Sequence, residues 1–507
     1  MLSRLPSAAL RGLDAEPVDV EVDLSRGLPC WSMVGLADAS VREAKERVRS
    51  ALLNSNFDFP LAHITVNLSP ADQRKEGSYF DLPVAMGLLL ASGQIVPDQD
   101  RQTAMPMLLG ELALDGRLNP VTGILPLVLF AQQQGFASVI VPQENAKEAA
   151  LVEGLDILPA ASLLSVAQHI TAYASLTPYV LEAFNDDAKA IENDLDLADV
   201  RGQQQAKRAL EIAAAGGHNL LMSGSPGVGK SMLAARLPSI LPPLTMSQRL
   251  EVARIYSIAN NQTRSPLSNQ PPFRSPHHTS SDVALIGGGS RPKPGEISLA
   301  HTGVLFLDEL PEFKRPALEV LRQPLETGEV HIARAAETLT FPARFSLIAA
   351  FNPCPCGFLG HPIKACRCSD MQVRRYRERM SGPLLDRFDL RIHVPPVEQE
   401  KLTQLPAGES SKDVAERVLA ARTIQYQRQG EGVSNAMLSV RMLERLSQPD
   451  AEGQKLLNVA MTRFALSARA YHRILKVART IADLAAETSI SSAHIAEALQ
   501  YRGDDEF

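Results

Sequence analysis

A glycine-rich segment in the middle of the chain has residue types that bind phosphate. Residues 224–231 fit the pattern G-x-x-x-x-G-K-[ST], between the apolar run 220–222 and the helix-like stretch 232–237. Glycines let backbone N–H groups wrap a phosphate, and a helix start adds a field that favours anions. Lys230 supplies positive charge to the β- and γ-phosphates, and Ser231 supplies a hydroxyl ligand for Mg²⁺. The segment predicts an ATP site formed by Gly224, Ser225, Pro226, Gly227, Val228, Gly229, Lys230 and Ser231.

Two further apolar runs end in polar residues suited to the same chemistry. Val304–Leu307 precedes Asp308 and Glu309, and the run 345–351 precedes Asn352. Behind a phosphate loop, we expect Asp308 to hold Mg²⁺ through water and Glu309 to activate the attacking water as a general base. The amide of Asn352 is suited to orienting that water against the γ-phosphate.

Arg387 lies in the segment LLDRFDL, between an apolar turn and a β-like run. An arginine presented across a subunit boundary can stabilise a transferring phosphate and make hydrolysis depend on assembly. The alternative is a salt bridge to Asp386 or Asp389. Residue spacing does not distinguish a trans-acting arginine from an arginine held in a local salt bridge.

Four of the five cysteines lie in one short stretch, as two Cys-x-Cys pairs. Four thiolates can form the closed tetrahedral site that structural Zn²⁺ prefers, and such a site has no open position for catalysis. His361 is a substitute ligand, and free redox-active thiols or disulfides are the alternatives. The predicted zinc ligands are Cys354, Cys356, Cys366 and Cys368.

Alternating strand-like and helical patterns must position these residues. Residues 196–395 alternate apolar strands with helical segments, which predicts a parallel α/β sheet. Residues 396–507 are helical, with a long amphipathic helix over 470–484. Residues 1–172 mix both patterns: 63–70 alternates as a half-buried strand, and 39–54 reads as a helix with a Ser40–Glu43 capping box. The acidic residues within 173–195 indicate a linker or, equally, a solvated helix face.

Composition places the chain among globular proteins of several domains. It has 507 residues, 45% apolar content and a net charge of −6, so a nucleic-acid surface must be local. Charged residues interrupt the first apolar runs, and no apolar stretch is long enough to span a bilayer. We expect no signal peptide and no membrane contact. The clustered cysteines favour a reducing compartment, hence a cytoplasmic location.

The order of these segments resembles AAA+ ATPases, and within them the magnesium-chelatase-like branch that includes bacterial branch-migration helicases of natural transformation. The likeness also lies in VRGQQQAKRALEIAAAGGHNLLMSG, FRSPHHTSSDVALIGGG and LSARAYHRILKVARTIADL. It implies an AAA+ core over 196–395 and a helical lid over 396–507. It makes Arg387 a trans-acting arginine finger and Arg469 the sensor arginine of the lid, with Arg473 as the competing candidate.

The same resemblance implies two insertions that could face DNA. One is an insert in the second helix, around 275–296, where Arg291 and Lys293 could approach a phosphate backbone. The other is a β-hairpin before Asn352, with Val330 and Ile332 pairing back to residues 339–341 and Arg334 near its tip. A flexible loop and a purely structural hairpin are the alternatives.

A basic segment, MQVRRYRERM, follows the cysteine insert of 352–370. Arg374 and Arg375 flank Tyr376, and basic residues with an aromatic can bind phosphates and stack bases. A self-paired, solvated helix face is equally compatible with the pattern.

The first 172 residues resemble a Lon-protease-like domain of the ribosomal S5 superfamily. Lon-type proteolysis needs a Ser–Lys dyad. The segment Ser78–Asp81 stands where the serine belongs, and Leu125 stands where the lysine belongs. Since a leucine cannot activate a nucleophile, we expect a proteolytically inactive domain.

These observations together predict an ATP hydrolase that acts as a homo-hexameric DNA motor. The resemblance implies branch migration of recombination intermediates, with single-stranded and branched DNA and recombination proteins as partners and ATP, Mg²⁺ and structural Zn²⁺ as cofactors. The alternative is a chelatase-like or chaperone ATPase that remodels a protein partner.

Overall fold

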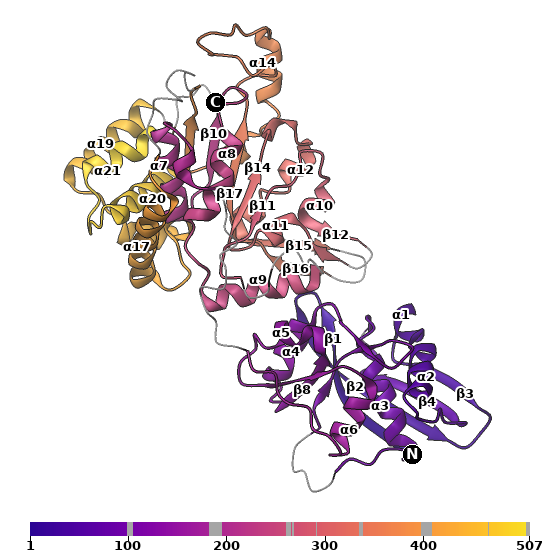
Figure 1. Cartoon of the computed structure of the whole chain (residues 1–507). Helices are drawn as coiled ribbons and strands as arrows, with labels where there is room; N and C mark the ends of the chain where they lie inside the picture. The colour runs from indigo at the N-terminus through magenta and orange to yellow at the C-terminus, as the bar shows by residue number, and fades with distance from the viewer. Residues whose placement is uncertain are drawn as a thin grey trace. The chain divides into compact units, whose positions relative to one another are not determined.

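The computed structural model describes residues 1–72, 74–98, 105–181, 195–259, 265, 268–289, 292–333, 338–396, 408–464 and 466–502. The chain divides into two compact units (Figure 1). Unit 1 is Met1–Ala188 with Ala253–Ser268, and unit 2 is Lys189–Val252 with Asn269–Phe507. Most of the acidic stretch predicted as a linker falls on 182–194, outside the described residues. Among the described helices, none has the length and apolar character needed to cross a membrane.

Unit 1 is built on a four-stranded sheet in the order β1-β2-β4-β3. β1 (Leu2–Arg11), β2 (Asp14–Ser25) and β4 (His63–Ser69) pair antiparallel, and β3 (Cys30–Val34) pairs parallel with β4. The predicted strand over 63–70 is confirmed as β4, with its alternate apolar side chains buried. The helix α3 (Asp81–Ala91) has apolar side chains on nearly all sides and is almost wholly buried. A smaller parallel sheet, β5 (Met107–Leu108), β8 (Ser138–Pro142) and β9 (Asp156–Ala160), completes the unit with α4 (Ile124–Gln133).

The capping box predicted at Ser40 is wrong. The helix is divided into α1 (Ala39–Arg42) and α2 (Ala44–Asn54), and the Asp38 carboxylate caps the first turn by accepting the backbone N–H of Val41 at 3.0 Å. Asp38 also accepts the Ser40 hydroxyl at 2.6 Å, so the serine is engaged with the capping residue. A carboxylate at this position also benefits from the positive end of the helix dipole.

Unit 2 contains the predicted parallel sheet, and the mixed α/β fold class is confirmed. Five parallel strands run in the order β11-β14-β17-β10-β18 (Figure 1). They are β11 (Phe273–Arg274), β14 (Val304–Leu307), β17 (Ser346–Phe351), β10 (Leu220–Ser223) and β18 (Leu390–His393). Three of them, β10, β14 and β17, are mostly apolar and buried, as expected of parallel strands covered on both faces.

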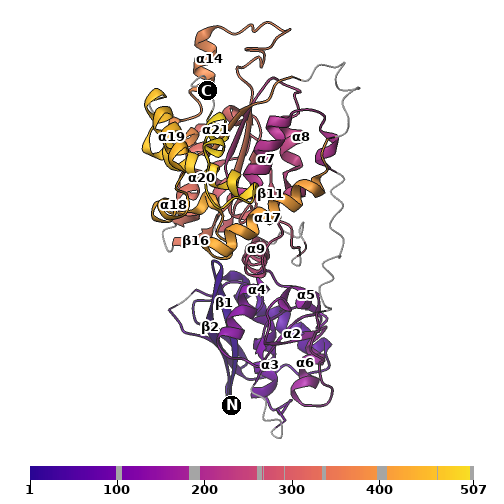
Figure 2. The same cartoon turned by 90° about the vertical axis from the view of Figure 1, so that its left-hand side faces the viewer.

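The C-terminal region is helical, as predicted. Its helices are α17 (Ser411–Gln429), α18 (Val440–Leu446), α19 (Ala451–Arg463), α20 (Ala468–Leu484) and α21 (Ser492–Gln500). Their apolar faces share one continuous core with α7 (Gln204–Gly216) and the sheet. Figure 2 shows these helices gathered beside α7 in unit 2. The C-terminal helices and the sheet of unit 2 are therefore packed as one folded body.

The predicted hairpin is present in the predicted register. β15 (Glu329–Ala333) and β16 (Thr338–Pro342) pair antiparallel, with Val330 opposite Phe341 and Ile332 opposite Leu339. These four side chains lie on one face of the hairpin, because residues two apart along a strand point the same way. The insert before it contains α10 (Asp282–Ile286), β12 (Gly287–Gly288), β13 (Lys293–Pro294) and α11 (Glu296–Leu299).

Candidate functional site

Parallel strand pairing brings the predicted nucleotide residues together. β17 lies between β10 and β14, with Ser223 opposite Phe351 and Leu307 opposite Ala349. The carboxyl ends of all three strands therefore lie at one edge of the sheet. The glycine-rich loop, Asp308 and Asn352 each begin one residue beyond that edge, and ligands of open α/β sheets bind at this position.

The phosphate loop has the local geometry that its sequence predicts. α8 (Lys230–Ala235) begins directly after Gly229, which has φ +92° and forms the helix cap. A residue with a Cβ rarely adopts this φ, so glycine is favoured here. The loop therefore ends at a helix N-terminus, where backbone N–H groups favour an anion.

Lys230 occupies the centre of this arrangement. Its ammonium donates hydrogen bonds to the Gly224 carbonyl at 2.7 Å, the Ser225 carbonyl at 3.1 Å and Asn352 Oδ1 at 3.1 Å. The side chain is 7% exposed, and burial lowers its pKa. A buried cation whose hydrogen-bond partners are carbonyl and amide oxygens is well suited to exchange them for a phosphate.

Ser231 and Asp308 form a pair of oxygen donors beside Lys230. The Ser231 hydroxyl donates to Asp308 Oδ2, while Asp308 Oδ1 accepts the backbone N–H of Glu309 at 2.9 Å. A hydroxyl and a carboxylate in contact are the donor types that Mg²⁺ takes in nucleotide sites, where it keeps several waters. These residues fit a Mg²⁺–nucleotide complex.

Glu309 has a neighbour that sequence reasoning missed. His278 Nδ1 lies 3.4 Å from Glu309 Oε2, and His278 follows β11, the strand beside β14. Glu309 itself has φ +53°, an uncommon conformation for a residue with a side chain. The available signal was the His277–His278 pair a few residues beyond the short strand β11, but the sequence does not show which strand neighbours β14.

Arg387 is paired, but with neither of the aspartates considered from the sequence. Its guanidinium binds Glu326 at the end of α13 (Pro324–Thr327) and donates to the Pro383 carbonyl at 3.0 Å. Its side chain is 10% exposed, whereas that of Glu326 is 56% exposed. Arg387 is therefore a mostly covered cation held from outside by an accessible carboxylate.

The two candidate lid arginines lie in different environments. Arg469 is exposed in the first turn of α20. Arg473, one turn later, is mostly buried and lies 3.7 Å from Asp389, which also accepts the backbone N–H of Asn219 at 3.2 Å. Arg473 is thus engaged in the unit's interior, and Arg469 is the accessible one.

The four clustered cysteines converge on one point. Their sulfur atoms all lie within 4.8 Å of one another, and three pairs are 3.4 to 3.6 Å apart. Tetrahedral Zn–S bonds of about 2.3 Å put sulfurs about 3.8 Å apart, whereas a disulfide needs about 2.05 Å. The cluster fits a metal ion. His361 is outside it, since its Nδ1 accepts the backbone N–H groups of Ile363 and Lys364.

Electrostatics within the cluster also favour a cation. Hydrogen bonds from the backbone of Arg367 and Phe358 lower the pKa of Cys356 to about 6. A backbone hydrogen bond from Cys368 acts in the same direction on Cys366, but desolvation and the adjacent thiols outweigh it and raise the pKa of Cys366 to about 12. Thiols this close cannot all ionise by themselves, and a bound dication removes that penalty.

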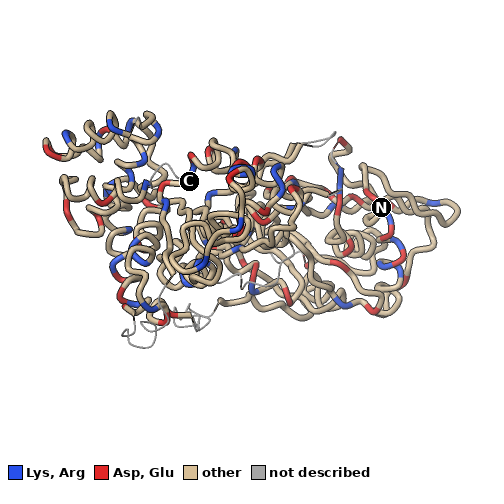
Figure 3. Tube along the Cα trace, turned by 90° about the horizontal axis from the view of Figure 1, so that it is seen from above, with Lys and Arg blue, Asp and Glu red and all other residues tan. Residues whose placement is uncertain are grey.

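The DNA-contact candidates are dispersed. Arg291 and Arg334 lie outside the described residues, and Lys293 is exposed on β13. Arg374 and Arg375 are exposed on α14 (Asp370–Arg377), where Arg374 pairs with Glu378 at 3.0 Å. Figure 3 shows basic and acidic residues interspersed along the described trace. The described candidates, Lys293, Arg374 and Arg375, therefore lie on two separate short elements.

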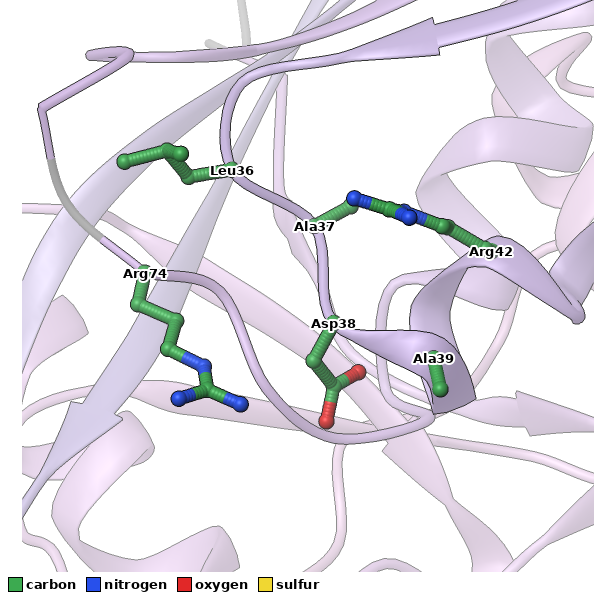
Figure 4. Close-up of a pocket in the computed structure, with 6 residues that line it drawn as sticks. All are labelled: Leu36, Ala37, Asp38, Ala39, Arg42 and Arg74. Atoms are coloured by element: carbon green, nitrogen blue, oxygen red, sulfur yellow. The ribbon is translucent and has the colours of Figure 1, made fainter.

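Unit 1 contains a separate open pocket of about 520 Å³, far from these residues in sequence. Its lining includes Asp38, Arg42 and Arg74 (Figure 4). The Asp38 carboxylate in this pocket already accepts hydrogen bonds from the Ser40 hydroxyl and the Val41 N–H at the start of α1.

Of the positions expected of a protease dyad in unit 1, Leu125 and Asp81 are buried, whereas Ser78 is half-buried. Leu125 is 0% exposed in α4. Asp81 is 1% exposed and binds Arg47 through two hydrogen bonds, at 2.6 and 3.0 Å. Neither side chain can reach a peptide substrate as it stands.

Profiles of the magnesium chelatase families match most of the chain. Residues 196–402 match magnesium chelatase, subunit ChlI; residues 20–145 match subunit ChlI of Mg-chelatase; and residues 408–502 match the ChlI C-terminal region.

Individual relatives extend this similarity over the full length. The chain is 48% identical to the competence protein ComM of Haemophilus influenzae, over 98% of this chain and 96% of that protein. It is 45% identical to the uncharacterized protein YifB of Salmonella typhimurium, over 99% of this chain and 97% of that protein. A shorter stretch, 37% of this chain and 19% of the other, is 28% identical to a bovine protein named DNA helicase MCM8.

Proposed function

The chain belongs to the magnesium-chelatase ChlI-like family of AAA+ ATPases, together with competence protein ComM, and we propose that it is a homo-hexameric DNA motor. It hydrolyses ATP and uses the energy for branch migration of recombination intermediates during natural transformation. Its partners are single-stranded and branched DNA and other recombination proteins. The names of two relatives, a competence protein and a DNA helicase, support this function.

The observation that carries the ATPase part is the contact of Lys230 with Asn352, beside the Ser231–Asp308 pair. In this proposal Lys230 binds the β- and γ-phosphates, and Ser231 and Asp308 hold Mg²⁺, which neutralises charge that develops on the phosphates. Glu309 accepts a proton from the attacking water, and Asn352 orients that water.

Two arginines complete the proposed site. Arg387 acts on the nucleotide of the neighbouring subunit, so its pair with Glu326 must open on assembly. Arg469 contacts nucleotide from the lid, because it is exposed where Arg473 is buried. Hydrolysis therefore depends on the ring, since one subunit alone lacks the arginine that stabilises the transition state.

Zinc in the cysteine cluster is structural in this proposal, because the four sulfurs leave no open position. Unit 1 is a proteolytically inactive, Lon-protease-like module, and the protein acts in the cytoplasm. Arg374 and Arg375 on α14, Lys293 on β13, and Arg291 and Arg334 contact DNA phosphates.

A single comparison tests the proposal. ATPase rate and oligomeric mass are measured with and without branched DNA, for the wild type and for Glu309→Gln. The variant should bind ATP but lose hydrolysis and strand movement. Glu452→Gln, an exposed carboxylate on α19, serves as the matched control and should behave as the wild type.

The second candidate, a chaperone-like ATPase that remodels a protein partner, is favoured by the net charge of −6 and the dispersed basic residues. DNA that stimulates the ATPase supports the motor. Normal strand movement by Glu309→Gln would refute the proposed mechanism, and a wild-type ATPase that ignores DNA would support the remodelling function.

A further inference from the structure

The cysteine cluster is joined to the nucleotide site by the chain itself. Asn352, whose side chain accepts a hydrogen bond from Lys230, is two residues before the first cysteine of the cluster. The intervening Pro353 and Cys354 are buried, and Cys354 is 0% exposed. The metal-binding loop therefore begins inside the unit, against the ATP site, although α14 and the loop project from unit 2 in Figures 1 and 2.

The loop also returns to touch the phosphate loop. Gly357 has φ +81°, and its N–H donates to the Cys354 carbonyl at 2.9 Å in a tight turn within the cluster. A Cβ on Gly357 would lie 2.4 Å from Cδ and 2.5 Å from Cγ of Pro226. The Gly357 backbone is thus packed against Pro226, at a distance that leaves no room for a side chain. The position of this contact depends on the two cysteines that flank the turn.

α14 holds the same segment from the other end. Tyr376 is 5% exposed, burial raises its pKa to about 12, and its hydroxyl is hydrogen-bonded to the backbone of Asn352. Arg377 Nε donates to the Pro353 carbonyl at 3.4 Å. Arg379 donates to the Pro311 carbonyl at 3.1 Å, two residues after Glu309. The helix is therefore fixed to the segments that follow both β14 and β17.

We infer that the cysteine loop is a metal-dependent brace of the phosphate loop, with Gly357 as the positioning residue, so that metal occupancy controls nucleotide affinity. The inference rests on the proposed ATP and metal sites. Without a metal, no covalent bond joins the turn of Cys354 and Cys356 to Cys366 and Cys368, because all four cysteines are free thiols. The Gly357–Pro226 contact is then lost, and the loop that cradles the phosphates loses one of its walls.

Two alanine variants in the same loop separate this role from simple backbone strain. Gly357→Ala places a Cβ against Pro226, whereas Gly360→Ala, also at positive φ (+76°), meets nothing within 4 Å. Binding of a fluorescent ADP analogue and zinc content by elemental analysis are measured on both. We expect Gly357→Ala to weaken binding about tenfold, from overpacking of the contact, while zinc content stays at the wild-type level. The affinity of Gly360→Ala for the ADP analogue should remain within about twofold of the wild type. Its Cβ strains the backbone of the cysteine loop but contacts nothing in the phosphate loop.

A rescue and a metal-removal experiment complete the test. In a Pro226→Ala background, Gly357→Ala should weaken binding of the ADP analogue by less than about a further twofold. The proline ring atoms that the new Cβ would contact are absent in that background. Wild-type protein treated with a chelator should lose affinity about as much as Gly357→Ala while its far-ultraviolet circular dichroism is retained. Equal effects of the two glycine variants, absence of rescue, or full affinity of the folded zinc-free protein would each overturn the inference.

Failure of the proposed function gives a different result. A wild-type protein with full zinc content that binds no nucleotide would overturn the ATP site and the inference together. A wild type that binds nucleotide normally, with variants that do not behave as above, would overturn the inference alone.

Discussion

Replacing Glu326 with glutamine should make assembly-dependent hydrolysis easier. In the isolated chain Glu326 holds Arg387, which the proposal assigns to the neighbouring subunit's nucleotide. The pair must open before Arg387 can act, so its free energy opposes assembly. Because the Glu326 side chain is 56% exposed, solvent screens the pair, and pairs of this kind contribute about 0.2–1 kcal/mol. At 1.36 kcal/mol per factor of ten, Glu326→Gln should lower the protein concentration of half-maximal ATPase by up to about fivefold per interface.

The assay is ATPase rate against protein concentration at fixed ATP, with oligomeric mass measured in parallel. The maximal rate should not change, because Glu326 takes no part in the reaction. Arg387→Ala should leave the nucleotide affinity of the single subunit intact but lower the maximal rate, by as much as about a thousandfold if it acts as trans-acting arginines do elsewhere. Glu452→Gln is the control, since Glu452 is an exposed carboxylate on α19 and takes no part in the Arg387 contacts. A Glu326→Gln protein that needs a higher concentration than the wild type, or an Arg387→Ala protein at full rate, would refute the reasoning.

Two further predictions concern buried charges. Arg47→Met should destabilise unit 1 by about 3–5 kcal/mol at neutral pH, because it leaves the Asp81 carboxylate buried without its partner. Burial already raises the pKa of Asp81 to about 6 from its ordinary 3.8, so the folded state gains protons and stability as pH falls through this window. Urea unfolding should therefore show a smaller loss at pH 5 than at pH 7.5, and an equal loss would contradict this account. Arg473→Ala should cost about 1–3 kcal/mol of stability, because the buried Asp389 carboxylate loses this arginine and keeps only His218 and the Asn219 N–H, whereas Arg469→Ala should stay within about 0.5 kcal/mol and lower only ATP hydrolysis. Thermal unfolding and ATPase rates on the two variants separate the lid arginines, and the reverse pattern would reassign the sensor role to Arg473.

The parts of the site that could be predicted are those encoded by short sequence patterns. An apolar run followed by Asp308 or Asn352 identifies a strand end, and parallel strands bring such ends to one edge of the sheet. The hairpin register could be predicted too, because alternation over Val330 and Ile332 fixes which side chains share a face. At the strand ends and in the hairpin, the local pattern of apolar residues and the tertiary packing favour the same backbone arrangement.

Contacts between distant segments could not be predicted in this way. Arg387 pairs with Glu326, 61 residues earlier, although Asp386 and Asp389 are adjacent in sequence. The side chain of Asp389 is turned inward, where it accepts the backbone N–H of Asn219. Its direction depends on packing rather than on spacing. The capping box failed for a related reason, because two candidate caps compete and the carboxylate of Asp38 wins over the hydroxyl of Ser40.

The position of Asn352 makes the cysteine insert more than a local stabilising feature. Its side chain accepts a hydrogen bond from Lys230, its backbone is hydrogen-bonded to Tyr376 on α14, and the chain continues directly into the cysteine cluster. The outer face of this insert exposes Ile363 by 87% and Met371 by 79%. If the basic residues beside them contact DNA, a pull on α14 is transmitted through packed and hydrogen-bonded groups to the residue proposed to orient the lytic water. By reciprocity of coupling, nucleotide state must then alter DNA affinity by the same factor. A motor needs such a connection in both directions, and within the described residues this insert contacts both the proposed nucleotide site and solvent.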